Sequence, residues 1–146
     1  MSEGGVIFST PTSDMNNINA ISTKEITVSF TTGSSTLSDE SKYKIDKEFL
    51  NVAQNFANSR IRIAGNTDNT GNYNNNVYLS KQRAQAVADY LSNEHGFDRN
   101  RFIVIGNGPN NPVSDNNTEL GRSKNRRTRI VILPQLDQFF KLLEKK

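Results

Sequence analysis

The sequence predicts a mixed α/β fold, because stretches with strand patterning and stretches with helix patterning alternate along most of the chain. Ile26–Phe30 alternates apolar and polar residues, as a strand with one buried face does. The stretch that begins near Ser38 has apolar residues at helical spacing, and Arg60–Ile63 alternates again. With 146 residues, the chain has about the size of one domain that can bury a core.

Composition narrows the chemistry that is available. The chain has no Cys, which excludes disulfides, thiol nucleophiles and Cys-ligated zinc, and its single His95 limits imidazole chemistry. A net charge of +3 permits anionic partners without demanding them. No apolar run approaches the roughly 20 residues that span a bilayer, and Met1–Gly5 lacks the features of a signal peptide. We therefore expect no membrane span and no export signal in this chain.

The first folded elements are expected after a polar N-terminal segment. Residues 1–23 show no sustained period, so we interpret them as a flexible linker or tail, followed by one domain over 24–146. Turn residues at 32–35 end the first strand. Ser38 is the expected N-cap of a helix that runs to Asn58. Its apolar stripe, with the aromatic residues in the core, comprises Ile45, Phe49, Ala53, Phe56 and Ala57.

The middle of the chain predicts a strand, a helix and a further strand. Arg60–Ile63 is the second strand, with both isoleucines on one face, and it runs into a loop that begins at Gly65. Asn76–Glu94 is the second helix, and Gly96 is placed to end it. Phe102–Ile105 is the third strand. A strand, helix and strand in this length predict a right-handed crossover.

The last third of the chain predicts a loop at 106–112, a short helix over Thr118–Ser123 and a final strand over Thr128–Leu133. Pro134 stops that strand. Four apolar residues then recur at helical spacing and predict a short C-terminal amphipathic helix that packs on the sheet or, alternatively, docks a partner: Leu136, Phe139, Phe140 and Leu143.

One acid and one arginine stand out as a candidate binding site. Asp68 leaves the second strand, and Arg83 falls near the buried edge of the second helix, in one sector with Asn76, Ser80 and Val87. A buried arginine needs an anionic partner. Two interpretations are open: an internal salt bridge between Asp68 and Arg83, or a clamp in which Asp68 accepts from an ammonium and Arg83 grips a carboxylate.

The order of motifs resembles one known family, the OmpA-like peptidoglycan-binding domain. The match covers about Ile26 to Leu133 and rests on Phe30-x-x-Gly33-Ser34, Gly65-Asn66-Thr67-Asp68, Gly71, Asn76, Leu79-Ser80, Arg83-Ala84, Gly106-x-Gly108, Pro112, Asn116, Thr118, Gly121-Arg122 and Asn125-Arg126-Arg127. The resemblance implies a two-layer βαβαβ core with an additional strand in a mixed sheet. It also implies non-covalent binding of the meso-diaminopimelate residue of peptidoglycan stem peptides.

The resemblance assigns roles to particular residues. Asp68 corresponds to the acid that meets the diaminopimelate ammonium, and Arg83 to the arginine that meets its carboxylate. Asn66 stands where the commonest family residue is His. The residues implied to line or support the pocket are Phe30, Gly33, Thr67, Asn76, Leu79, Ser80, Arg126 and Arg127.

The resemblance implies a periplasmic binding module that tethers a larger envelope protein or complex to the cell wall. We expect no enzymatic activity, cofactor, catalytic residue or metal site, because no calcium loop or dinucleotide fingerprint is present. An interaction scaffold that has lost wall binding is the alternative. A nucleic-acid partner is not expected, because no aromatic residues interleave with the basic run Arg122–Arg129.

Overall fold

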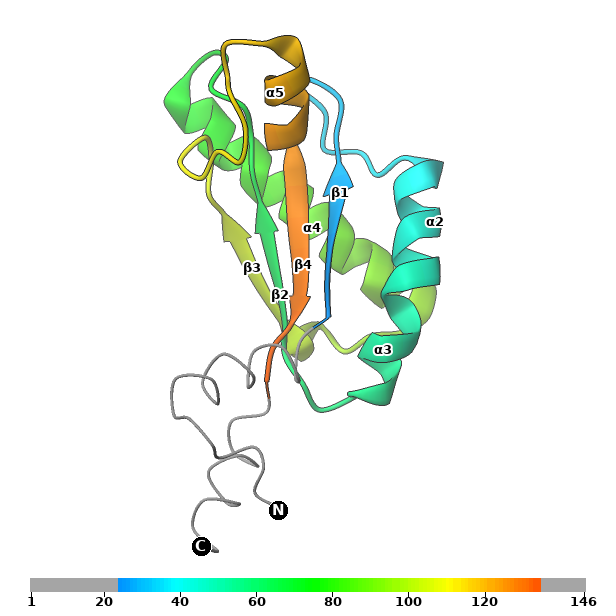
Figure 1. Ribbon diagram of the computed structural model, residues 1–146. Helices are drawn as coiled ribbons and strands as arrows, with labels where there is room; N and C mark the ends of the chain where they lie inside the picture. Colours follow the sequence, from blue (N-terminus) through cyan, green and yellow to red (C-terminus); the bar gives the residue numbers. More distant parts are fainter. Residues whose placement is uncertain (1–23, 135–146) are drawn as a thin grey trace, which may run out of the picture.

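Four short strands form one mixed sheet in the computed structural model, which describes residues 24–134 (Figure 1). The strand order is β1-β4-β2-β3. β2 and β3 run parallel, and β4 runs antiparallel to both of its neighbours. The predicted α/β class and the predicted strands are confirmed, with ends that differ by at most two residues from prediction: β1 (Glu25–Ser29), β2 (Ile61–Gly65), β3 (Phe102–Gly106) and β4 (Arg127–Ile132).

Helix α4 (Tyr73–His95) connects β2 to β3, as the predicted strand, helix and strand unit requires. It begins three residues before the predicted Asn76, because the Asn72 side chain accepts a hydrogen bond from the backbone of Asn75 at 3.0 Å and so caps it. Gly96 ends the helix in the left-handed conformation, with φ at 72°, as predicted.

The helical stretch after Ser38 is interrupted. Ser38 caps α2 (Asp39–Glu48) by accepting from the backbone N–H of Ser41, as predicted, but a second helix, α3 (Leu50–Asn55), follows a break at Phe49. The prediction that Phe56 lies in the core is wrong, since its side chain is 43% exposed. Phe56 ends α3 with φ −106° and ψ 58°, so it leaves the helical stripe before it can reach the sheet.

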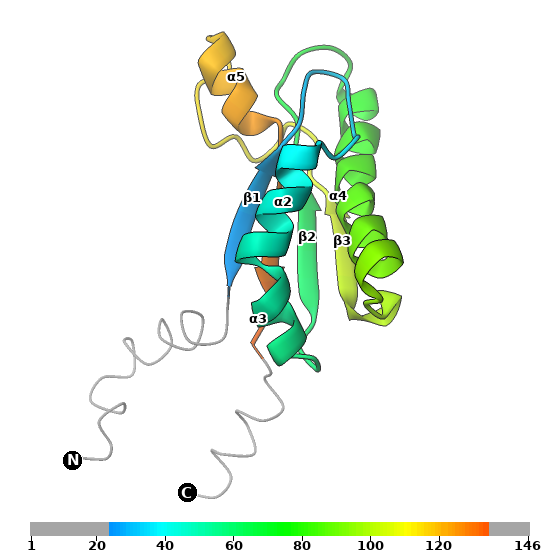
Figure 2. The same cartoon turned by 90° about the vertical axis from the view of Figure 1, so that its right-hand side faces the viewer.

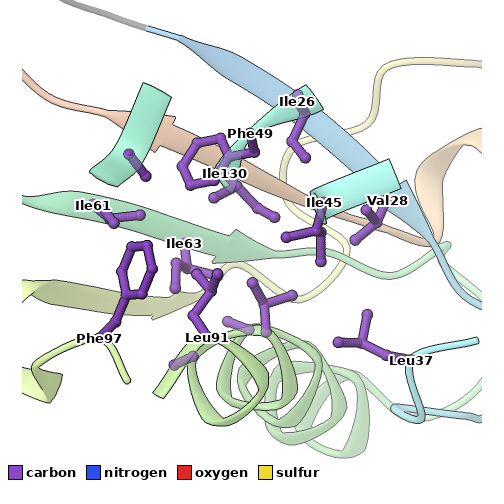
Figure 3. Close-up of a cluster of buried hydrophobic side chains, with 14 of the residues drawn as sticks. Ile26, Val28, Leu37, Ile45, Phe49, Ile61, Ile63, Leu91, Phe97 and Ile130 are labelled. Atoms are coloured by element: carbon purple, nitrogen blue, oxygen red, sulfur yellow. The ribbon is translucent and has the colours of Figure 1, made fainter. Parts of the chain in front are cut away.

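The core lies between one face of the sheet and helices α2, α3 and α4 (Figures 2 and 3). Alternate residues of β1, β2 and β4 point into it and are almost completely buried: Ile26, Val28, Ile61, Ile63, Ile130 and Ile132. Helix α4 packs on β2 and β3, and α2 packs on β1. Among the described residues, no helix in Figure 1 covers the opposite face along the strands, and we call it the helix-free face; it includes Arg62, Ala64, Arg129 and Val131.

Two further helical elements of the described chain lie at opposite ends of the sheet. A 3-10 turn, Arg99–Arg101, precedes β3. Helix α5 (Glu119–Asn125) matches the predicted short helix, and Thr118 caps it by accepting from the backbone of Gly121 at 3.0 Å. The expected N-terminal linker and the expected C-terminal helix lie outside the described residues. No helix within 24–134 is long and apolar enough to cross a membrane.

Candidate functional site

Two glycines bring the ends of the parallel strands against the backbone of α4. A Cβ atom on Gly65 would lie 1.8 Å from the carbonyl oxygen of Ser80, and one on Gly106 would lie 2.8 Å from the backbone nitrogen of Lys81. Only glycine permits such close approach. The loops that follow β2 and β3 are therefore held beside the part of α4 that carries Arg83.

Arg83 lies inside this contact and is only 1% exposed. Its guanidinium donates three hydrogen bonds to backbone carbonyls, from Nε to Ser34 at 2.8 Å, from Nη1 to Asn66 at 2.9 Å and from Nη2 to Thr31 at 3.0 Å. Because a guanidinium has five N–H groups, one N–H on each Nη lies outside these bonds. Arg83 therefore joins the loop after β1 to the loop after β2 and keeps further donors.

The charge of Arg83 is stabilised by dipoles and by an aromatic ring. The guanidinium carbon lies 5.2 Å from the centre of the Phe30 ring, a cation–π distance. Burial lowers the pKa of Arg83 to about 10, although the negative charge of Asp68 opposes that shift. The side chain is still protonated at neutral pH. Within residues 24–134 it forms no ion pair with a carboxylate, so its positive charge is not neutralised at short range.

Asp68 lies at the same end of the fold and is 6% exposed. Its Oδ1 accepts from the backbone N–H of Thr70 at 2.9 Å, and its Oδ2 accepts from Nη1 of Arg126 at 2.9 Å. Burial raises the pKa of Asp68, but the hydrogen bonds from Thr70 and Arg126 together outweigh burial and leave the pKa below its ordinary value. The carboxylate is therefore ionised at neutral pH.

The interpretation of Asp68 and Arg83 as an internal salt bridge is wrong. The ion pair of Asp68 within the described residues is with Arg126, and Arg83 bonds to carbonyl oxygens instead. The acid and the arginine are thus held separately, each by its own set of protein contacts.

Arg126 connects Asp68 to a residue that the sequence analysis missed. Its Nη2 donates to Oε2 of Glu119 at 2.7 Å, while Nη1 holds Asp68, and its buried Nε has no partner among the described residues. The pKa of Arg126 is raised, chiefly by its hydrogen bond to the Glu119 carboxylate. Burial opposes this rise, and the hydrogen bond to Asp68 adds to it. The sequence does place Glu119 directly after the capping Thr118 and two helical turns before Arg126, a spacing that puts the two side chains on the same side of α5.

Three of the predicted supporting residues hold the loops in place. Thr67 donates to the carbonyl of Asp68 at 2.7 Å, and Asn76 donates from Nδ2 to the carbonyl of Thr70 at 2.9 Å. Ser80 is fully buried, and its Oγ accepts from the backbone N–H of Gly108 at 2.8 Å. These contacts fix both the loop that carries Asp68 and the loop that follows β3.

The other predicted residues lie at the margins of the site. Gly33 occupies an exposed turn with φ at 71°, where Ser34 donates to the carbonyl of Thr31. Leu79 is half-buried on α4. Arg127 is not beside Asp68 and Arg83: it lines a depression on the helix-free face, where its Nη2 donates to the carbonyl of Asn111 at 2.9 Å.

Asn66, which departs from the common family residue, is 2% exposed and fully engaged. Its backbone carbonyl accepts from Arg83, and its Nδ2 donates to the carbonyl of Ala64 at 3.1 Å. Its Oδ1 accepts from Nδ2 of Asn107 at 3.1 Å. The side chain therefore braces the two loops, and the departure leaves the backbone contact to Arg83 intact.

The single histidine lies at the other end of α4 from the site. Its Nε2 is 2.8 Å from Oδ1 of Asp46. Tyr90 donates to the same carboxylate, and burial followed by that hydrogen bond raises the pKa of Tyr90 to about 12. This cluster joins α4 to α2. Across residues 24–134, no group of three or more His, Asp or Glu side chains could hold a metal ion.

The fold and the site define a class of protein: a two-layer α/β domain that buries an acid and an arginine among loops at one end of its sheet. The model of the OmpA family matches residues 29–126, which is about two thirds of the chain. This chain therefore belongs to the OmpA family.

Named relatives and a solved structure agree with that membership. The chain is 46% identical over 74 residues to the peptidoglycan-binding protein ArfA of Mycobacterium tuberculosis, a match that covers 51% of this chain and 22% of ArfA. It is 38% identical over 103 residues to outer membrane protein Omp38 of Acinetobacter baumannii, covering 70% of this chain and 29% of Omp38. The matched segment thus spans less than a third of either relative.

The crystal structure of the peptidoglycan-associated lipoprotein from Burkholderia pseudomallei superposes with a TM-score of 0.66 at 27% sequence identity. The alignment covers 72% of this chain and 87% of the lipoprotein chain. The similarity thus extends over most of this chain.

Proposed function

We propose that this chain binds peptidoglycan without covalent chemistry and without catalysis, through the diaminopimelate residue of the stem peptide. The observation that carries the proposal is the separate burial of two opposite charges: Asp68 pairs with Arg126, whereas Arg83 is held by neutral carbonyls. A buried cation without a carboxylate at short range favours an anionic ligand.

The donors and acceptors fit a side chain that carries both an ammonium and a carboxylate. Each carboxylate oxygen of Asp68 accepts one hydrogen bond within the described residues and has a second lone pair for an ammonium. Arg83 retains one N–H on each Nη, which is the pair that a guanidinium uses to bind a carboxylate in bidentate fashion. The side chain of diaminopimelate ends in these two groups.

Access to Arg83 requires a small movement of the surrounding loops, because the side chain is 1% exposed. The turn at 31–33 is exposed and supplies only backbone contacts to the guanidinium. We propose that this turn shifts when the ligand carboxylate enters, and that the charge-assisted contact to the ligand compensates for the carbonyl contact that is weakened.

Relatives support the same function and suggest its setting. ArfA is named as a peptidoglycan-binding protein, and the aligned crystal structure is that of a peptidoglycan-associated lipoprotein. Omp38 is named as an outer membrane protein. We propose that the chain works in the periplasm and anchors a larger envelope protein or complex to the wall.

A co-sedimentation experiment with isolated peptidoglycan tests the proposal. Asp68→Ala and Arg83→Ala should each weaken binding at least about tenfold, because each removes one side of a desolvated charged contact. Arg99→Ala and Asp89→Ala are matched controls, since these residues form an ion pair on the exposed surface of α4 and the turn after it. If both site variants fold and still sediment as the parent does, the assigned site is wrong.

The second candidate function is an interaction scaffold that does not bind the wall. The observation that favours it is the near-complete enclosure of Arg83 by loop carbonyls, which would also suit a purely structural role. The parent chain distinguishes the two functions: a scaffold does not sediment with peptidoglycan, whereas a wall anchor does.

A further inference from the structure

The helix-free face contains a depression that the proposed wall-binding site does not use. It is open to solvent, encloses about 370 Å³ together with the solvent above it, and lies over β2 and β4 where they approach the loop end of the sheet. Six polar residues line it, three arginines and three asparagines: Arg62, Arg127, Arg129, Asn66, Asn107 and Asn111. Among the residues that the structure describes, no carboxylate lines it.

The positive charge of this depression is only partly balanced by the protein. Arg129 pairs with Glu25 of β1, and both side chains are about half exposed. Arg127 is buried and donates to the carbonyls of Asn111 and Asn125. Burial, and then the like charge of Arg129, lower the pKa of Arg127. Arg62 is exposed beside them. The three guanidinium groups are therefore accompanied by one carboxylate, that of Glu25, which pairs with Arg129 and lies outside the depression.

We propose that the depression is an anion-binding site for a phosphate group carried on a soluble molecule. Guanidinium groups match phosphate oxygens in bidentate fashion, and three of them offer more donors than the two oxygens of a carboxylate can accept. Asn107 and Asn111 also line the depression and add polar groups to it. A bilayer surface is disfavoured as the source of the phosphate, because the arginines line a hollow and a flat surface would meet its rim first.

The phosphate site is separate from the wall-binding site, although the two share one residue. The backbone carbonyl of Asn66 accepts a hydrogen bond from Arg83, and Asn66 also lines the depression. Arg62 and Arg129 lie on exposed strand positions, and within residues 24–134 neither forms a hydrogen bond or ion pair with Asp68 or Arg83. Phosphate binding can therefore succeed or fail independently of peptidoglycan binding.

Pyrophosphate is the probe for a calorimetric titration of the whole 146-residue chain. Arg62→Gln should weaken pyrophosphate binding roughly fivefold, the factor that corresponds to one exposed charged contact. Glu25→Gln should tighten it by a similar factor, because Arg129 then loses its competing carboxylate. Arg99→Gln and Asp89→Asn make the same changes in net charge at a distant surface pair and should alter the affinity less than twofold, roughly the error of such a titration.

Tightening by Glu25→Gln together with weakening by Arg62→Gln supports the site, since general changes in charge would act equally in the controls. The proposal is overturned if pyrophosphate does not bind, if the control variants change affinity as much as the site variants do, or if vesicles of phosphatidylglycerol bind more tightly than pyrophosphate. Co-sedimentation with peptidoglycan should be unchanged in Arg62→Gln, which separates this test from that of the proposed function.

Discussion

Replacing Arg83 with lysine separates the charge of the side chain from its hydrogen-bonding geometry. Lysine keeps the positive charge but has a single ammonium, whereas three guanidinium nitrogens of Arg83 reach three carbonyls at 2.8 to 3.0 Å. One ammonium cannot span carbonyls from two loops. The substitution therefore tests whether the guanidinium group of Arg83 holds the loop after β1 and the loop after β2 together.

The expected cost comes mainly from one carbonyl. Asn66 is 2% exposed, so its oxygen has no water to replace the lost donor, whereas Thr31 is exposed and Ser34 is half-buried, and both can be hydrated. A hydrogen bond from a charged donor contributes about 1.5 to 3 kcal/mol. Arg83→Lys should lower the free energy of unfolding by about 2 to 3 kcal/mol and the Tm by roughly 10 °C.

Urea denaturation followed by circular dichroism at neutral pH measures this loss. Arg99→Lys is the matched control, because Arg99 is half exposed and its loss should change stability little. An Arg83→Lys variant as stable as the parent would refute the reasoning, since the carbonyl contacts would then contribute nothing that an ammonium cannot supply.

Two further predictions follow from the same contacts. Gly65→Ala should destabilise the domain by at least about 3 kcal/mol, since the added methyl would lie 1.8 Å from the Ser80 carbonyl oxygen and α4 would have to move; Gly33→Ala, with open space around its Cβ, should cost only about 1 kcal/mol for its positive φ. Denaturation midpoints compare the two, and equal losses would contradict the close packing of β2 on α4. Because the pKa of Asp68 is lower in the folded state than its ordinary 3.8, its contribution to stability is present above that value and is lost as the pH falls below it. In Asp68→Asn, the free energy of unfolding from urea titrations should therefore fall less steeply as the pH is lowered from neutral to about 3. The same pH dependence in the variant and the parent would show that Arg126 does not stabilise the ionised form of Asp68.

Local chemistry made most of the fold predictable. Ser38 and Gly96 were recognised as helix boundaries because each acts through its own backbone or side chain, within a few residues of the helix it ends. The buried stripe of Ile45, Phe49 and Ala53 was also found from spacing alone. Phe56 is misplaced by periodicity, because spacing alone does not show that the helix ends at Asn55 and that Phe56 leaves the helical conformation.

The position of the two candidate residues was predictable, and their pairing was not. Spacing and resemblance predict that Asp68 and Arg83 lie at the same end of the sheet, and they do. The partner of Asp68 could not be found in the same way, since Arg126 is 58 residues away in sequence. The two meet only because β4 lies next to β2 in the sheet, which brings the residue before β4 to the loop after β2. Glu119, by contrast, lies only seven residues before Arg126, at the start of α5.

The most direct test of the central claim compares two stem peptides that differ in one group. One carries meso-diaminopimelate, and the other carries lysine at the same position, which keeps the ammonium and lacks the carboxylate. If Arg83 binds that carboxylate, calorimetric titration of the parent chain should give at least about tenfold tighter binding of the diaminopimelate peptide, and Arg83→Ala should abolish the difference. Equal affinities of the parent chain for the two peptides would contradict the assignment of Arg83 as the carboxylate-binding residue.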